Sequence, residues 1–343
     1  CISCQHSLAR VAALLVLFPS PQQGNQSGRG TLALTGFQRS LALAPTWPEL
    51  WEETGKFFLH LWPVLNQDER RFATACLERA LLLAPERTEA ILAFAFPIDP
   101  NLPAAVSSTD PRRGFAAARL YRQHRDSERA HRQARQVAAR LTQEVTQDTG
   151  AFSSLLLLGE VQLFLGNHKE AKAVYEQGFT RASDPAVRGD FCWHLADWYY
   201  DREDYITAGD YYRRYLMLAP DTPEAMLRLG ICTLRTGKRE EGVRWLERAA
   251  ELRLEDAAQR IQLAQAFEEA GRYDRANALY RRLLAQEAQP RPDLLLSLAR
   301  NYIHLGLQRE ALSVYQQLLV VDTANAEARM FIDSVGKPRQ PAR

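Results

Sequence analysis

The apolar residues of this chain recur every three to four positions along most of its length, which is the period of an amphipathic α-helix. We find no convincing run of the alternating pattern that marks a half-buried strand. Residues 19–30 break the helical pattern and are rich in Pro, Gly, Ser, Gln and Asn, a composition typical of a flexible linker. The pattern therefore predicts an all-α protein whose helices follow this segment.

Two series of small residues advance in step between residues 152 and 323. Both series step forward by 37, 34, 34 and 35 residues, and each member of the first series directly follows a leucine. The first series is Gly159, Ala196, Gly230, Ala264 and Ala299. The second is Ala171, Ala208, Gly242, Ala276 and Ala311. Two independent markers that move together indicate five consecutive repeats, which we number from the N-terminal side.

Each repeat is predicted to be a helix, a short turn and a second helix packed antiparallel to the first. The small residues let the two helices approach closely, and four of the five repeats carry a tyrosine four residues after the second marker, one turn along the same face. These tyrosines are expected to fill the space between repeats: Tyr175, Tyr212, Tyr280 and Tyr315. Glycines are expected to end the first helices, where a positive φ is needed: Gly166, Gly237, Gly271 and Gly306.

At these residues the chain resembles the tetratricopeptide repeat family, whose period is about 34 residues. The resemblance implies an α-solenoid of antiparallel helix-turn-helix repeats that forms a right-handed superhelix. It also implies that the first helices line a concave groove. A helix over residues 324–336 is expected to cap the open end of the array, followed by a polar tail over 337–343.

Residues 31–148 carry a weaker form of the pattern and are predicted to be degenerate repeat-like helices. Phe37 fits a second helix, and Trp51, Gly55 and Phe58 begin the next pair. About six extra residues within 61–71 are expected to distort that hairpin. Four prolines predict an irregular loop near 97–111, because proline interrupts helices.

Residues 1–30 are interpreted as an N-terminal apolar segment and the linker. The run Val11–Phe18 follows Arg10 and is too short to span a bilayer, which takes about 20 residues. It matches a signal-peptide core, or the end of a longer membrane segment, and the alternative is an isolated apolar helix turn. A lipoprotein that begins at Cys1 is a further option. Cys1 and Cys4 have CxxC spacing, but no second pair completes a structural zinc site.

The composition and motifs give no sign of catalysis. The net charge of +2 provides no general attraction to nucleic acid, and no nucleophile elbow, phosphate-binding loop or HExxH motif is present. We therefore expect no enzyme activity, no cofactor, no metal site and no nucleic-acid partner. Cys76, Cys192 and Cys232 are expected to be small buried residues. The arginines of residues 112–140 are either a basic surface for anionic partners or a solvated face balanced by acids.

The family resemblance identifies the residues that would face the groove. They suit an extended peptide or a partner helix, and they are Trp193, Asp197, Tyr200, Arg228, Arg235, Gln265, Glu268, Arg300 and His304. The subgroup that grips C-terminal carboxylates uses Lys and Asn at positions that hold Trp193, Asp197, Leu227 and Ile231 in this chain, so that activity is not expected. The sequence predicts a non-enzymatic scaffold for protein–protein interactions.

An alternative function comes from a second, weaker resemblance. Residues 43–51 and 80–85 resemble repeat regions attached to O-antigen polymerase or ligase-like membrane proteins of bacteria. This resemblance implies a periplasmic or membrane-linked part of an envelope polysaccharide assembly protein, exported or anchored at its N-terminus. Without such a segment, the chain would be cytoplasmic.

Overall fold

The computed structural model describes residues 26–148, 150–252, 254–286 and 289–336, and these ranges contain helices and turns but no strand. The prediction of an all-α helical-repeat fold is therefore confirmed, while the handedness of the superhelix stays a prediction. Contacts between Cα atoms divide the chain into two compact units, Cys1–Val174 and Tyr175–Arg343. The division falls within one helix of the first repeat, α10, and the two compact units are described separately.

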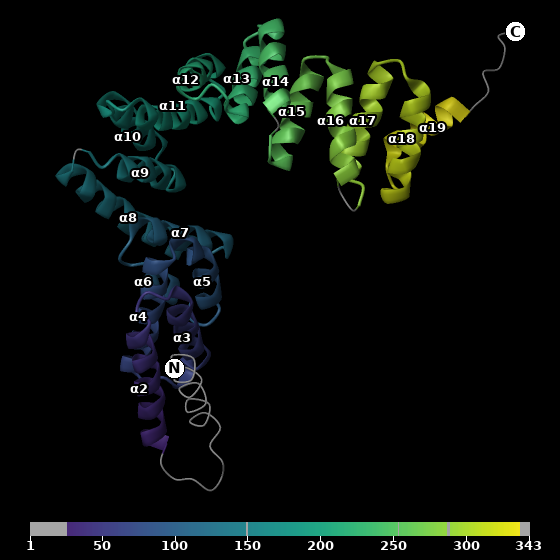
Figure 1. The fold of residues 1–343 in the computed structure, drawn as a ribbon. Coiled ribbons are helices and arrows are strands. Elements are labelled where there is room, and N and C mark those ends of the chain that lie inside the picture. Colours follow the sequence, from purple (N-terminus) through teal and green to yellow (C-terminus); the bar gives the residue numbers. More distant parts are fainter. Residues whose placement is uncertain (1–25, 149, 253, 287–288, 337–343) are drawn as a thin grey trace, which may run out of the picture. The chain divides into compact units, whose positions relative to one another are not determined.

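The first compact unit is built from helices of unequal length (Figure 1). In chain order these are α2 (Gln26–Leu43), α3 (Pro48–His60), α4 (Gln67–Leu83), α5 (Thr88–Ala95), α6 (Leu102–Val106), α7 (Pro111–Gln123), α8 (Ser127–Gln147) and α9 (Phe152–Phe164), with 3-10 turns at Trp62–Val64 and Pro85–Arg87. The extra residues predicted within 61–71 form the first of these turns. Asn66 then starts α4 with a capping box, in which its side chain accepts from the Glu69 backbone and Glu69 bonds back.

Two sequence-based predictions for this compact unit need correction. Residues 26–30, predicted to be part of a linker, are the first turn of α2. Glycine and serine are poor helix formers by up to about 1 kcal/mol each, but packing decides most helices, and the fully buried Phe37 anchors α2 downstream. The predicted loop near 97–111 contains the short helix α6, whose Leu102 and Val106 are buried. The predicted apolar segment over residues 11–18 lies outside the described residues.

The second compact unit begins within α10 (His168–Arg181), the second helix of the first repeat (Figure 1). The following helices are α11 (Pro185–Tyr200), α12 (Tyr205–Leu218), α13 (Pro223–Arg235), α14 (Arg239–Leu252), α15 (Ala257–Glu269), α16 (Tyr273–Gln286), α17 (Pro292–His304), α18 (Gln308–Val321) and α19 (Ala326–Gly336). Aspartates start several of these helices by accepting a hydrogen bond from a free backbone N–H of the first turn, as Asp184, Asp204 and Asp256 do.

The residues that define the repeat occupy the positions that the pattern predicts. The tyrosines Tyr175, Tyr212, Tyr280 and Tyr315 are all at most 1% exposed. The helices approach closely at the small residues, because a Cβ added at Gly230 would lie 2.6 Å from Leu246 of the paired helix. The glycines that end the first helices all have positive φ, between 67° and 83°: Gly166, Gly237, Gly271 and Gly306.

The cysteines of the described part also agree with prediction, since Cys76, Cys192 and Cys232 are free and buried among apolar residues. Burial raises the pKa of the Cys232 thiol to about 12, so this sulfur stays protonated at neutral pH. Within the described helices, none combines the length and the apolar character that crossing a bilayer requires.

Candidate partner-binding surface

The predicted groove residues of the second and third repeats meet in one aromatic and charged cluster. Trp193 of α11 packs edge-on against Tyr212 and Tyr215 of α12, with ring centroids 5.8 and 5.2 Å apart. Asp197 accepts a hydrogen bond from the Tyr212 hydroxyl. Trp193 is half-buried by these contacts. This packing predicts that substitution of Trp193 lowers the melting temperature.

Arg228 of α13 joins this cluster to the next repeat. Its guanidinium lies 4.6 Å from the centre of the half-buried Tyr200 ring, a cation–π distance. Burial alone would lower the pKa of Arg228, but Tyr212, Asp197 and Tyr200 outweigh it and raise that pKa. Burial also raises the pKa of Tyr200, with Arg228 opposing the rise. The arginine is therefore a fixed positive charge held between two first helices.

The predicted residues of the later repeats link further pairs of first helices. Arg235 of α13 forms an ion pair with Glu269 of α15, with 2.9 Å between Nε and Oε1. Asn301 of α17 donates to Glu268 of α15 at 2.6 Å. Burial raises the pKa of Glu268, against the lowering effect of Asn301 and other neighbours. Gln265, between these contacts, is exposed.

The last two predicted residues lie where the fifth repeat meets its neighbours. Both oxygens of Glu327 in α19 accept from Arg300, from Nε at 2.9 Å and from Nη2 at 2.5 Å. His304 stacks on Tyr273 of α16 with ring centroids 4.6 Å apart and an interplanar angle of 7°. Arg300 and His304 are both exposed. The helix α19 thus occupies the place of a further first helix and engages the end of the row.

These contacts show a shared arrangement that the sequence did not reveal. Apart from Gln265, each predicted residue contacts the adjacent repeat, the capping helix α19 or its own second helix. The partners that sequence reasoning missed are Tyr212, Tyr215, Glu269, Asn301, Tyr273 and Glu327. Several of them lie about one repeat away, so the repeat register was the signal that could have found them. We call the row of predicted residues from Trp193 to His304 the first-helix surface.

The first-helix surface presents rings, amides and charges, the groups that contact peptides. In the part of the chain that the structure describes, no three His, Cys, Asp or Glu side chains are grouped closely enough to hold a metal ion.

Several arginines of residues 112–140 form ion pairs with nearby acids. Arg113 pairs with Asp110 at 3.3 Å and Arg129 with Asp126 at 2.5 Å. These local pairs favour the balanced, solvated face over a basic binding surface.

Comparison with known protein families finds helical repeats in two parts of the chain. Two models described as tetratricopeptide repeat match the chain, one over residues 152–185 and the other over residues 267–332. The first match covers the first repeat, and the second runs from the end of α15 into α19. The chain therefore contains tetratricopeptide repeats within residues 152–185 and 267–332. No curated protein matches its sequence.

Several solved structures of helical repeat proteins align with part of the chain. YrrB, described as a TPR protein with an unusual peptide-binding site, aligns over 55% of this chain and 96% of its own, with 16% identity and a TM-score of 0.47. PilW, a type IV pilus biogenesis factor, aligns over 66% and 98%, with 18% identity and a TM-score of 0.46. A tetratricopeptide repeat protein from Parabacteroides merdae aligns over 67% and 94%, with 13% identity and a TM-score of 0.43.

Proposed function

We propose that this protein is a non-enzymatic scaffold that binds another protein along the first-helix surface, as an extended peptide or a helix in the groove. The observation that carries the proposal is the combination of in-register repeats with a row of half-buried rings and exposed polar groups on successive first helices. Repeat arrays present a large surface without an enclosed pocket, which suits them to holding partners.

The exposed members of the row are the best candidates for direct contact with the partner. Arg235 is half exposed through its pairing with Glu269, and Gln265, Arg300 and His304 are exposed. Exposed ion pairs contribute about 0–1 kcal/mol to stability, so a partner can displace Glu269 or Glu327 at low cost. The half-buried Trp193 and Tyr200 would then supply apolar contact beside these charges.

The test is a selection of random 12-residue peptides displayed on phage and bound to the full chain. Affinities of the enriched peptides are then measured for Arg235→Ala, Gln265→Ala and His304→Ala, whose exposed positions leave the fold intact. The matched control is Arg244→Ala, an exposed position on the second helix α14. We expect each first-helix variant to bind at least about fivefold more weakly, roughly 1 kcal/mol. Equal binding by all four variants, or no enriched peptide, would contradict the proposal.

The envelope role remains a separate proposal about location. It depends on an apolar segment at residues 11–18, and it is supported only by the resemblance of residues 43–51 and 80–85 to envelope repeat regions. Fractionation of cells that express the full natural gene, with the protein followed by immunoblot, tests it. Recovery from the periplasm or the membrane fraction is expected, and recovery only from the cytoplasm would contradict it.

A further inference from the structure

One core position of the first helix differs in the fourth repeat from all the others. The position lies three residues before the leucine that marks each repeat, and in four repeats it holds a buried apolar residue. These are Leu155, Cys192, Met226 and Leu295, each at most 2% exposed. In the fourth repeat the same position is Arg260, which is only partly buried. A charged, partly buried side chain therefore replaces an apolar one where the first helix meets its neighbours.

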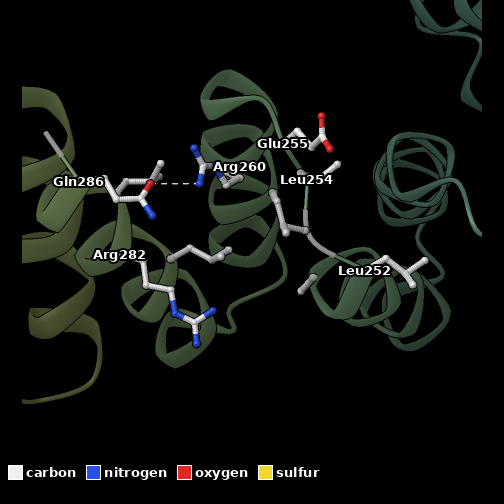
Figure 2. Close-up of a pocket in the computed structure, with 10 residues that line it drawn as sticks. Leu252, Leu254, Glu255, Arg260, Arg282 and Gln286 are labelled. Atoms are coloured by element: carbon white, nitrogen blue, oxygen red, sulfur yellow. Dashed lines mark hydrogen bonds between the residues drawn. The ribbon is translucent and has the colours of Figure 1, made fainter.

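A cleft of about 580 Å³ lies at this replacement, among α14, α15 and α16. Figure 2 shows Arg260, Arg282 and Gln286 on one side of it, with Leu252 and Leu254 on another. The remaining walls are largely leucine, and Leu252 is 43% exposed. The size lies within the range of about 300–1,000 Å³ that is usual for ligand sites.

Within the described part of the chain, Arg260 and Arg282 of the cleft have no carboxylate partner. Arg260 donates from Nη1 to the neutral amide oxygen of Gln286 at 3.1 Å, and its buried Nε atom has no hydrogen-bond partner. Arg282 is exposed and makes no ion pair with any residue in the described ranges. Among the described residues that line the cleft, Glu255 is the one acid, and it is exposed to solvent. The cleft thus combines leucine walls with two guanidinium groups that a carboxylate can satisfy.

The hollow is elongated and does not end at Arg282. A second hollow of about 290 Å³ shares Ala250, Leu279 and Arg282 with the first and continues along α14 and α16. Its lining adds Glu247 and Glu251, so the acidic side chain of a bound segment belongs at the Arg260 end. A run of hollows between helices suits a short stretch of chain better than a compact molecule. The arginines and the leucine walls of the first hollow define which stretch of chain would fit.

We propose that this cleft binds a peptide segment in which an acidic side chain stands beside leucine-sized apolar side chains. The carboxylate accepts hydrogen bonds from Arg260 and Arg282, and the apolar side chains pack on Leu252, Leu254 and the leucines behind them. The site uses no residue of the first-helix surface. It is a second docking point, and it can be present or absent independently of the proposed function.

The test uses a fluorescein-labelled peptide, blocked at both ends, with a central glutamate followed by two leucines and flanked by glycine and serine. Fluorescence anisotropy measures its binding to the full chain. We expect saturable binding with a Kd below about 1 mM, and binding at least about tenfold weaker when glutamine replaces the glutamate. Equal affinity for the glutamate and the glutamine peptide, or no saturation up to about 1 mM, would overturn the proposal.

Two variants and a control locate the binding. Arg260→Met introduces the residue type found at Met226 and removes one of the two guanidinium groups, so it is expected to lose binding at least tenfold while melting no lower than the unaltered chain. Arg282→Gln removes one charge from an exposed position and is expected to weaken binding at least fivefold. Arg281→Met, next to Arg282 and also exposed, is the matched control and should bind normally.

The outcomes separate this site from the first-helix surface. If Gln265→Ala and His304→Ala lose the peptide while Arg260→Met and Arg282→Gln keep it, the peptide binds the first-helix surface. That result overturns the cleft and leaves the proposed function standing. If the cleft variants lose this peptide while the phage-selected peptides bind the first-helix variants as tightly as the unaltered chain, the cleft stands and the proposed function fails.

Discussion

The junction between the second and third repeats and the junction between the third and fourth follow the same plan but are packed differently. At the first, α12 packs along α13, and the core position of α13 is Met226, which is 1% exposed. At the second, α14 contacts α15 far less extensively, and the same position is Arg260 beside a cleft. The closed junction thus carries an apolar residue where the open one carries an arginine, although both keep the helical period.

The difference has a consequence for stability as well as for binding. The stability of a repeat array is approximately the sum of repeat and junction contributions. The open junction gives up apolar burial, which is worth about 25 cal/mol per Å². It retains a polar link, because Arg239 of α14 donates from Nε to the Ala270 carbonyl at 2.8 Å. The following predictions test this comparison.

The largest effect is expected from giving the closed junction the residue of the open one. Met226→Arg places an unpaired charge at a position that is 1% exposed, and we expect a loss of about 3–5 kcal/mol in the free energy of unfolding. Urea unfolding followed by circular dichroism measures it. The control Met217→Arg, at an 81% exposed position of α12, should change little. Similar small losses in both variants would mean that Met226 is not a core residue.

A smaller effect is expected from two turn glycines that differ in one contact. Gly237 has a φ of +83° and open space around an added Cβ, so Gly237→Ala costs only backbone strain, about 1–2 kcal/mol. A Cβ at Gly271 would also lie 2.3 Å from Nη2 of Arg239 and would disturb the link across the open junction. We expect Gly271→Ala to lose about 1 kcal/mol more than Gly237→Ala, as measured by thermal unfolding. Equal losses would show that the Arg239 link contributes nothing.

The smallest effect is a pH dependence at Glu268. Burial raises the pKa of Glu268 in the folded chain above its usual value of 4.5, so the folded state binds this proton more tightly than the unfolded state. The stability that protonated Glu268 contributes is therefore fully present below pH 4.5 and is lost as the pH rises through the folded pKa. Glu268→Gln keeps the acceptor for Asn301 and removes this loss.

The measurement is the urea midpoint of Glu268→Gln and of the unaltered chain between pH 4 and pH 7. We expect nearly equal midpoints at the acidic end and a more stable variant at neutral pH. The control is Glu269→Gln, whose carboxylate pairs with Arg235 at the surface. A difference between Glu268→Gln and the unaltered chain that does not vary with pH would contradict the assignment.

The regular part of the fold was predictable because its markers repeat. The leucine–small pairs appear in all five repeats, and the buried tyrosines and the turn glycines each appear in four of them. The sequence therefore locates them without coordinates. The first turn of α2 and the helix α6 were not predictable in this way. Their residues favour turns, and long-range burial of Phe37, Leu102 and Val106 determines their structure.

The candidate sites were predictable only in part. Trp193, Tyr200 and Arg228 could be selected by register, but the ion pair of Arg300 with Glu327 of the capping helix required the helices to be placed side by side. Arg260 was visible in the sequence as an arginine in a column of apolar residues. A search for catalytic and metal-binding motifs does not find Arg260. Its significance is visible only when the same position is compared across the repeats, because the other four repeats hold apolar residues there.

The most direct test of the account is hydrogen exchange measured by mass spectrometry across the two junctions. The account predicts that backbone amides at the end of α14 and the start of α15 exchange faster than those at the end of α12 and the start of α13, because the open junction unfolds locally more often. It also predicts that Arg260→Met slows exchange at α14 and α15 and leaves α12 and α13 unchanged. Equal exchange at both junctions, or no response to Arg260→Met, would contradict it.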